Sequence, residues 1–159
     1  QAQQGKTIQA IFNQVILNST ALYEYQPRSE ADMQQWFETR VRGNFPVLGY
    51  VDASNQLLGF ASYGPFRDKP ANRLTLEHAV YVAEQARGLG IGRLLLQALM
   101  QRATTQGYHT LIAAIDTQNL ASIHLHESEG FVYAGTLHEV ASKFDRWLDL
   151  AFYQKLLKT

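Results

Sequence analysis

The sequence predicts a mixed α/β fold in which helices flank a central β-sheet. Its length of 159 residues suits one domain, and its 46% hydrophobic and 18% charged residues indicate a packed core. Two apolar segments that pair as a hairpin precede an alternation of strand, helix, strand, helix, strand and strand. That order is typical of a mixed sheet whose parallel strands are connected by helices. We therefore expect residues 1–159 to form a single domain.

Two helices are predicted at the start of the chain. Apolar residues recur at helical spacing over residues 8–16, which predicts an amphipathic helix that ends near residues 18–19. After Pro27, Ser29 is placed to cap a second helix with an acidic first turn. This second helix is expected to end at Gly43.

The remaining elements follow from alternating apolar residues and from glycine positions. Residues 46–51 and 57–63 flank a turn cluster and predict a β-hairpin. Residues 74–82 alternate between two faces, so Glu77 is expected to point away from His78. Further strands are predicted over residues 110–115, 131–140 and 147–156, and further helices over residues 89–106 and 121–129, which end at Gly107 and Gly130.

The composition excludes several classes of function. Fourteen Lys and Arg residues balance fourteen Asp and Glu residues, so no overall charge favours nucleic acids or acidic membranes. The apolar runs are too short to span a membrane. The absence of cysteine removes disulfides, thiolate metal sites and cysteine nucleophiles, and it fits a cytoplasmic location. We expect no metal site, because His124 and His126 lack the spacing that converges on one ion.

A glycine-rich segment over residues 85–93 carries the strongest chemical signal. Arg87, Gly88, Gly90 and Gly92 lie between a predicted strand and a predicted helix, where backbone N–H groups can bind a phosphate. The segment lacks the Lys-Ser or Lys-Thr of a P-loop, and Arg93 occupies the third glycine position of a dinucleotide fingerprint. The residues alone leave open a phosphate-binding turn and an ordinary strand-to-helix turn.

Several motifs in the same order along the chain carry a family resemblance. The Arg-x-x-Gly-x-Gly pattern at Arg87, Gly90 and Gly92 resembles the turn with which GNAT acetyltransferases hold the pyrophosphate of acetyl-CoA. Segments resembling the phosphinothricin and methionine sulfoximine N-acetyltransferase subgroup cover residues 18–21, 36–40, 63–67, 75–82, 119–127 and 143–149. The resemblance therefore spans nearly the whole chain.

The resemblance implies the GNAT acyl-CoA N-acyltransferase fold and an enzyme that uses acetyl-CoA as cosubstrate. It implies direct acetyl transfer, in a ternary complex, to the α-amine of a small amino-acid-like substrate, and a homodimer. The residues expected to hold acetyl-CoA are Val80, Tyr81, Val82, Arg87, Gly88, Leu89, Gly90, Ile91, Gly92, Arg93 and Asn119. Of these, Val80, Tyr81 and Val82 are expected to contribute backbone groups from a splayed strand.

The chemistry requires a base, an oxyanion donor and protonation of the leaving thiolate. Glu77 lies where the family has its catalytic glutamate and is the expected general base, with an exposed strand residue as the alternative. The backbone N–H of Val82 is the expected oxyanion donor. His126 lies where many GNAT enzymes have an acidic tyrosine, so it either replaces that acid or serves only in packing.

Candidate substrate-binding residues precede and follow this centre. Arg67 is expected to bind a substrate carboxylate through its planar guanidinium. Arg73 and Lys143 are weaker candidates for the same anionic group. The resemblance places His78 beside the substrate, with a buried core histidine as the alternative. The chain departs from the subgroup at Asp145, where glycine is usual, and it shows no recognisable first strand before Gln9.

Two other functions remain open. A GNAT enzyme for a polyamine, an aminoglycoside or a protein N-terminus is one alternative, although Arg67 beside Lys69 argues against a polycationic substrate. A non-catalytic acyl-CoA sensor is the other, and the presence of Glu77 argues against it.

Overall fold

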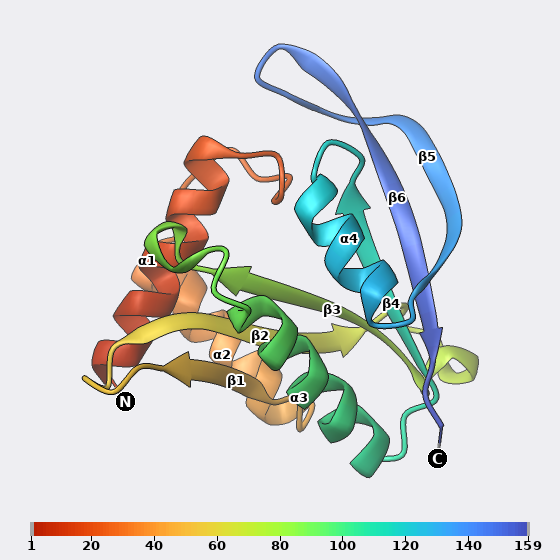
Figure 1. Ribbon diagram of the computed structural model, residues 1–159, viewed down its shortest axis with the longest axis horizontal. Coiled ribbons are helices and arrows are strands. Elements are labelled where there is room, and N and C mark those ends of the chain that lie inside the picture. Colours follow the sequence, from red (N-terminus) through yellow and green to blue (C-terminus); the bar gives the residue numbers. More distant parts are fainter. Residues whose placement is uncertain (1, 159) are drawn as a thin grey trace.

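The computed structural model describes residues 2–158, which form a six-stranded sheet in the order β1-β2-β3-β4-β6-β5. Figure 1 shows the sheet with helices on both sides. In chain order the elements are α1 (Ala2–Asn18), α2 (Glu30–Arg42), β1 (Val47–Val51), β2 (Leu57–Pro65), η1 (Pro70–Asn72), β3 (Thr75–Val82), η2 (Glu84–Ala86), α3 (Ile91–Thr105), β4 (Thr110–Asp116), α4 (Leu120–Ser128), β5 (Val132–Lys143) and β6 (Arg146–Leu156). No helix among these residues is long and apolar enough to cross a membrane.

The two N-terminal helices confirm the prediction from sequence. The Ser29 hydroxyl accepts a hydrogen bond from the Asp32 N–H (3.1 Å), and the Asp32 carboxylate accepts one from the Ser29 N–H (2.8 Å). This reciprocal capping box satisfies donors that the first turn of α2 leaves free. From Ala2 onward the chain before Gln9 is part of α1, so no strand precedes that helix within residues 2–158.

Apart from the earlier start of α1 at Ala2 and the extension of β2 to Pro65, the predicted boundaries hold to within one residue except at α3 and β5. The helix predicted over residues 89–106 begins only at Ile91, because Gly88 and Gly90 have φ values of 79° and 81°. Neither residue can therefore belong to a right-handed helix. The strand predicted over residues 131–140 continues to Lys143, where Lys143 pairs with Arg146 of β6.

The sheet is open between its two central strands. β3 and β4 are parallel, and their pairing runs only from Thr75↔Thr110 to His78↔Ala113. Beyond those pairs β3 continues along β2 as far as Val82, and β4 continues along β6 as far as Asp116. The two strands therefore diverge at their carboxyl ends, which confirms the expected splay.

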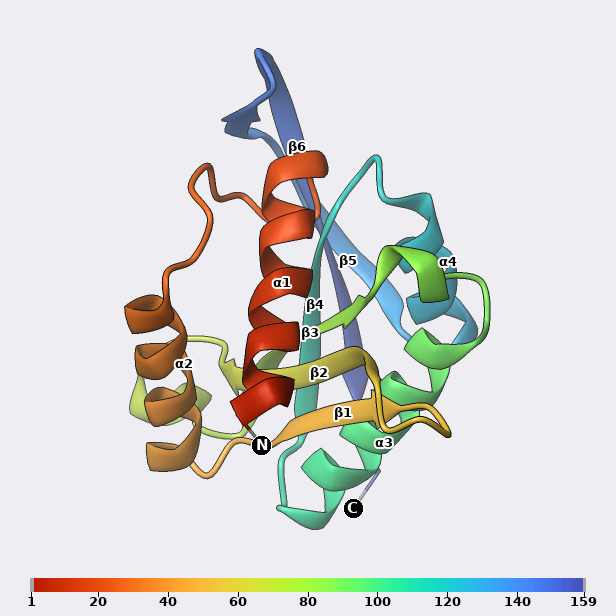
Figure 2. The ribbon, with the colours of Figure 1, turned by 90° about the vertical axis from the view of Figure 1, so that its left-hand side faces the viewer.

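The helices divide between the two faces of the sheet. Figure 2 shows α1 and α2 on one face, with α3 and α4 on the other. Successive side chains of β3 alternate between these faces. Tyr81 packs against Phe12 of α1 with ring centroids 5.2 Å apart, whereas His78 packs against His126 of α4. Glu77, four residues before Tyr81, lies on the α1/α2 face, and the expected opposition of Glu77 and His78 is confirmed.

Candidate active site

A cavity of about 720 Å³ lies at the divergence of β3 and β4. Its walls come from the end of β3, the glycine-rich turn, the end of β4, the start of α4 and the residues that follow α1. Of the eleven residues expected to hold acetyl-CoA, only Leu89 does not line the cavity. Leu89 is 69% exposed and projects away from the protein.

The glycine-rich turn presents backbone to this cavity. A Cβ at either Gly88 or Gly90 would meet no atom within 4 Å, so both positions face open space. The turn leads directly into α3, whose first N–H groups have no earlier helical carbonyl to bind. Free N–H groups and the positive end of the helix together suit a phosphate.

The arginine side chains of this turn are held by the protein itself. Arg93 forms a salt bridge with Glu129 (2.7 Å) and donates a hydrogen bond to Ser128 (3.0 Å). Arg87 donates to the Val82 carbonyl (3.4 Å) and to the Gln14 side chain (3.3 Å). The phosphate-binding capacity of the turn therefore lies mainly in its backbone.

Strand β3 offers backbone groups at alternate residues only. The Ala83 N–H donates to the Leu58 carbonyl (2.8 Å), so this position bonds to β2. Because N–H and C=O groups alternate in direction along a strand, those of Val82 and Val80 point toward the gap between β3 and β4. The prediction that Tyr81 also offers backbone groups is wrong, because its register with Phe60 directs them toward β2. Tyr81 nevertheless lines the cavity, and its ring packs against Phe12.

Asn119 begins α4 at the rim of the cavity. Its side-chain oxygen accepts a hydrogen bond from the Ser122 N–H (3.3 Å), which is the capping role that the sequence suggested. Asn119 lines the cavity, and within residues 2–158 its amide nitrogen donates no hydrogen bond, so one residue can cap the helix and bind a ligand.

Glu77 occupies the α1/α2 face of β3, close to the point where β3 leaves β4. Its side chain keeps contact with solvent, while partial burial raises its pKa above the ordinary glutamate value. A carboxylate with a raised pKa is a stronger base than a fully hydrated one. This setting suits removal of a proton from an ammonium group.

His78 and His126 form a buried pair at the base of the cavity. Their Nε2 atoms are 2.9 Å apart, and the His126 Nδ1 lies 2.7 Å from the Ser122 carbonyl oxygen. Since a carbonyl oxygen can only accept, the proton of a neutral His126 belongs on Nδ1. His126 Nε2 is then an acceptor, and His78 Nε2 is the donor between the rings.

This arrangement corrects two sequence-based expectations. A neutral His126 has no free N–H with which to protonate a thiolate, and burial lowers its pKa, which disfavours the cation. The role of acid is therefore not supported by the geometry, and the packing alternative is. His78 is 6% exposed and faces α4 rather than the side of Glu77, so it is a buried core histidine.

Lys143 is not free to bind substrate. Its ammonium group donates to the carbonyl oxygens of Ile16 (2.6 Å), Ser19 (2.7 Å) and Leu22 (2.7 Å), and the residue is 4% exposed. An ammonium group has three donors, so all of them are used. The expectation of a substrate contact is wrong for Lys143, which instead fastens the end of α1 to the β5–β6 hairpin.

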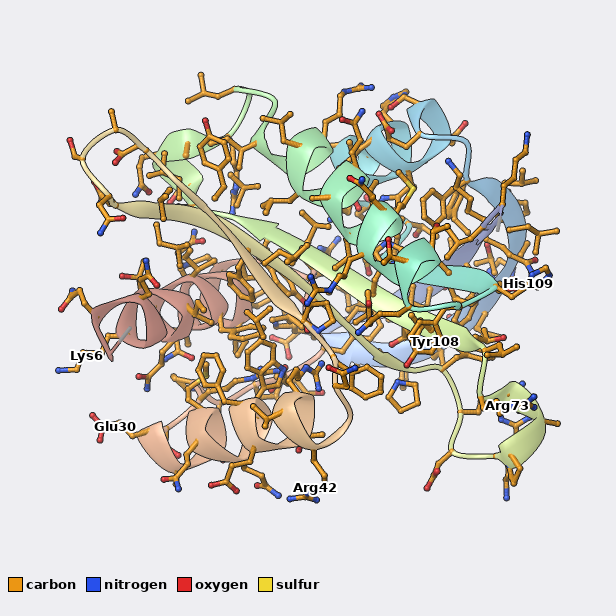
Figure 3. All side chains as sticks on the ribbon, turned by 90° about the horizontal axis from the view of Figure 1, so that it is seen from below. Lys6, Glu30, Arg42, Arg73, Tyr108 and His109 are labelled. Atoms are coloured by element: carbon orange, nitrogen blue, oxygen red, sulfur yellow. The ribbon has the colours of Figure 1, made fainter. Side chains whose placement is uncertain are left out.

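Arg67 and Arg73 both belong to the exposed segment between β2 and β3. Figure 3 shows Arg73 beside η1, which precedes β3, whereas the glycine-rich turn follows β3 at its other end. Within residues 2–158 neither guanidinium has a hydrogen-bonded partner or a salt bridge. Both remain free to bind an anion, but neither lines the acetyl-CoA cavity.

Two further charged residues near the site are not predicted as functional from the sequence. Arg28 and Arg40 line a smaller cavity on the α1/α2 face together with Glu24 and Trp36. The Arg28 guanidinium lies over the ring of Phe12, which is distant in the sequence, and the Arg40 guanidinium lies over Trp36, one helical turn earlier. Helical periodicity marks Trp36 as apolar but does not reveal a cation stacked on it.

Comparison with known proteins decides the family. A sequence model described as "Acetyltransferase (GNAT) family" matches residues 12–131. The chain belongs to the GNAT acetyltransferase family. GNAT acetyltransferases use acetyl-CoA, and the glycine-rich turn, the diverging strands and the cavity between them fit that cosubstrate.

Three relatives place this GNAT chain more closely. It is 47% identical over 147 residues to the L-methionine sulfoximine/L-methionine sulfone acetyltransferase of Pseudomonas aeruginosa, covering 92% of this chain and 86% of that protein. It is 36% identical to the phosphinothricin N-acetyltransferase of Alcaligenes faecalis, covering 94% and 76%. The structure of a phosphinothricin acetyltransferase from Sinorhizobium meliloti in complex with acetyl-CoA matches with a TM-score of 0.95 and 36% identity, covering 99% and 85%.

Replacing Gly90 by alanine is expected to weaken acetyl-CoA binding by this GNAT chain. A residue with a Cβ pays roughly 1–2 kcal/mol to keep a left-handed conformation, so the turn will relax and misdirect its N–H groups. Gly107→Ala is the matched control, because Gly107 also has a positive φ (85°) and an open Cβ position but lies at the other end of α3. Calorimetric titration with acetyl-CoA should show weaker binding only for Gly90→Ala, and equal affinity in both variants would contradict the assignment.

The buried histidine pair predicts a loss of stability in acid. Burial and the neighbouring His126 lower the pKa of His78 to about 3, whereas the ordinary value is 6.5. Below pH 6.5 this histidine binds a proton in the unfolded chain but stays neutral in the folded chain. The free energy of unfolding therefore falls by up to about 1.4 kcal/mol per pH unit for each such histidine. Urea unfolding at pH 7 and pH 5 should give a smaller difference for His78→Gln than for the wild type, while exposed His109→Gln should keep the full difference.

Proposed function

We propose that this protein transfers the acetyl group of acetyl-CoA to the α-amine of a small amino-acid-like substrate, directly and within a ternary complex. The observation that carries the proposal is the open end of β3. There the Val82 N–H faces the cavity while Glu77 lies on the opposite face of the sheet. An acyl donor and an amine can therefore approach the gap from opposite sides.

The glycine-rich turn would hold the pyrophosphate of acetyl-CoA, and the Val80 and Val82 backbone would pair with its pantetheine arm. The acyl donor supplies a thioester whose carbonyl carbon is open to attack by an amine. The Val82 N–H stabilises the negative charge that develops on the carbonyl oxygen, a contribution of about 3 kcal/mol for one such donor. This donor is fixed in place before the reaction by the pairing of β3 with β2.

Glu77 takes the proton from the substrate ammonium and so frees the nitrogen lone pair. The amine nitrogen then forms a bond to the thioester carbon, and the carbon–sulfur bond breaks with its electron pair on sulfur. The thiolate takes its proton from the attacking nitrogen, which must lose one as the amide forms. His126 is not required as the acid, because its neutral N–H is bound to Ser122.

The acceptor class follows from the relatives and from the free guanidinium groups between β2 and β3. The Pseudomonas aeruginosa and Alcaligenes faecalis enzymes are named for methionine sulfoximine, methionine sulfone and phosphinothricin. We propose acceptors of this type for the present chain, with Arg67 as the carboxylate-binding residue and Arg73 as a further cation beside it. A polycationic acceptor is disfavoured by the two free guanidinium groups of this segment.

A CoA-release assay tests the function. The panel contains methionine sulfoximine, methionine sulfone, phosphinothricin, ordinary amino acids and spermidine, each with acetyl-CoA. Turnover of the sulfur- or phosphorus-containing amino acids with a single acetylated product supports the proposal. Binding of acetyl-CoA without turnover of any amine would instead support a non-catalytic acyl-CoA sensor, and turnover of spermidine alone would support the polyamine alternative.

We further propose that residues 1–159 act as one domain, in the cytoplasm, and as a homodimer. The β5–β6 hairpin supports the dimer, because it extends beyond the helices (Figure 1) and exposes Val140, Phe144 and Trp147. Clustered exposed apolar side chains commonly mark protein contacts. Trp147→Glu is expected to shift the protein from dimer to monomer in light scattering, whereas a monomeric wild type would contradict the proposal.

A further inference from the structure

A second cavity, of about 370 Å³, lies on the α1/α2 face and is lined by Glu24, Arg28, Trp36 and Arg40 among others. Two packed rings connect it to the acetyl-CoA cavity. Tyr81 borders the larger cavity and stacks against Phe12, and the Arg28 guanidinium lies 3.9 Å from the centre of the Phe12 ring. A molecule in the second cavity would therefore lie on the Tyr81 face of β3, separated from the acetyl-CoA cavity by the Phe12 and Tyr81 rings.

Two arginines that line this cavity have unused donors. Arg28 binds Glu24 through Nε (3.1 Å) and Nη2 (2.9 Å), while its buried Nη1 has no hydrogen-bond partner among the described residues. Arg40 lies 4.7 Å from the centre of a Trp36 ring and donates only through Nε, to Ser62 (3.3 Å). Stacking on a ring fixes the guanidinium plane and leaves its edge free for an oxyanion.

The charges near Arg40 do not neutralise it. Glu24 is paired with Arg28, and the Asp32 carboxylate is bound to the Ser29 N–H in the capping box. Burial and the neighbouring Arg28 charge lower the pKa of Arg40, which fits a cation without a counterion. A partly buried cation of this kind gains from binding an anion.

Arg40 also lies near the proposed base. A Cβ at Gly64 would be 3.8 Å from Arg40 Nη2, and Gly64 is directly opposite Glu77 in the β2–β3 ladder. Directly opposed residues of antiparallel strands share a face of the sheet. Because Gly64 has no side chain, the Arg40 guanidinium can approach the backbone of β2 on the face that carries Glu77.

From this geometry we infer that Arg40, together with Arg28 held by Glu24, binds a negatively charged oxygen group of the acceptor while the acceptor amine lies at Glu77. The group is either the α-carboxylate or an acidic group at the far end of the acceptor side chain. This inference rests on the proposed function and makes the guanidinium pair a determinant of acceptor specificity. If the bound group is the side-chain acid, Arg40 adds a second anion-binding position to the one at Arg67, and if it is the α-carboxylate, Arg40 takes the role proposed for Arg67.

Three acceptors separate the two sources of the anion. Phosphinothricin carries a carboxylate and a phosphinate, methionine sulfone carries only the carboxylate, and methionine sulfone amide carries neither. For Arg40→Gln, KM is expected to rise roughly 10- to 100-fold wherever the bound anion is present, the range for loss of a charge-assisted hydrogen bond. The value of kcat should change by less than about threefold, because the base and the oxyanion donor are untouched.

The pattern across the acceptors identifies the group. If Arg40→Gln raises KM for phosphinothricin and methionine sulfone but not for the amide, the bound group is the α-carboxylate. If it raises KM for phosphinothricin alone, the bound group is the phosphinate. An equal rise in KM for all three acceptors, or no rise for any of them, would overturn the inference. Arg42→Gln is the matched control, because Arg42 is an exposed arginine of the same helix that does not line this cavity.

Glu24→Gln separates anion binding from a structural role of the ion pair. Removing the Glu24 charge frees the Arg28 guanidinium, so KM for the anionic acceptors is expected to fall, whereas Arg28→Gln is expected to raise it. If both variants raise KM, the pair serves only to hold the loop and the role of Arg28 is refuted. Thermal unfolding and acetyl-CoA affinity confirm that each variant is folded, and Arg40→Lys, which keeps the charge without the planar fork, should retain part of the affinity.

Failure of the inference is distinguishable from failure of the proposed function. If the wild type acetylates none of the three acceptors, the proposed function fails at that point. The role of Arg40 is then tested by calorimetric titration of phosphinothricin into the protein saturated with CoA. Weaker binding to Arg40→Gln than to Arg42→Gln would still support it, and equal binding would refute it.

Discussion

Glu77→Gln is expected to lower kcat/KM by roughly 10²- to 10⁴-fold, the usual contribution of a general base. Glutamine is nearly the same size and polarity but cannot accept a proton from the substrate ammonium. Acetyl-CoA affinity should stay unchanged, because Glu77 does not line the acetyl-CoA cavity. The measurement is a steady-state CoA-release assay with methionine sulfone, beside acetyl-CoA titration.

The pH dependence gives a second test of Glu77. The base must be deprotonated, and partial burial raises its pKa above the ordinary value of 4.5. Activity of the wild type should therefore fall as the pH decreases through a midpoint above 4.5, and this acidic limb should disappear in the residual activity of Glu77→Gln. Exposed Glu38→Gln serves as the control. Full activity in Glu77→Gln would exclude Glu77 as the base and favour a base supplied by water alone.

Lys143→Met is expected to lower the free energy of unfolding by roughly 3–5 kcal/mol. The ammonium group holds three carbonyl oxygens at the end of α1, where the negative end of the helix favours a cation. Methionine matches the length of lysine but leaves these carbonyls without a donor. At about 2–4 °C per kcal/mol, the melting temperature should fall by roughly 6–20 °C.

The same variant should weaken acetyl-CoA binding. Ser19, Thr20 and Ala21 line the acetyl-CoA cavity, and the Ser19 carbonyl is one of the three that Lys143 holds. Loosening of this segment disorders one wall of the cavity. Lys6→Met, at an exposed lysine of the same helix, should change neither stability nor affinity measurably. A melting temperature of Lys143→Met within about 2 °C of the wild type would contradict the proposed role.

The order of elements could be predicted because each carries a local signal. The Ser29 and Asp32 capping box and Gly107 mark helix ends that the structure confirms. The start of α3 was predicted two residues early, because apolar Leu89 continues the helical pattern although its glycine neighbours cannot be helical. Hydrophobic periodicity reports only on side chains, whereas the start of α3 is set by the backbone conformation of Gly88 and Gly90.

The roles of buried polar residues could not be predicted in the same way. Lys143 binds carbonyl oxygens more than 120 residues away, and any residue type offers such oxygens. His78 and His126 are separated by 48 residues, so only the packing of α4 on β3 brings them together. Arg28 and Arg40 look like solvated charges in the sequence, because stacking on Phe12 and Trp36 is a property of the folded chain.

The short β3–β4 ladder has a mechanical consequence. Four residue pairs, from Thr75↔Thr110 to His78↔Ala113, join a half-sheet of β1, β2 and β3 to a half-sheet of β4, β6 and β5. A ligand that lies in the gap between β3 and β4 contacts both half-sheets and links them. Without ligand, the two half-sheets should therefore separate transiently at the β3–β4 ladder. The amide hydrogens of Val80 and Val82 should exchange quickly with solvent, and bound acetyl-CoA should slow this exchange.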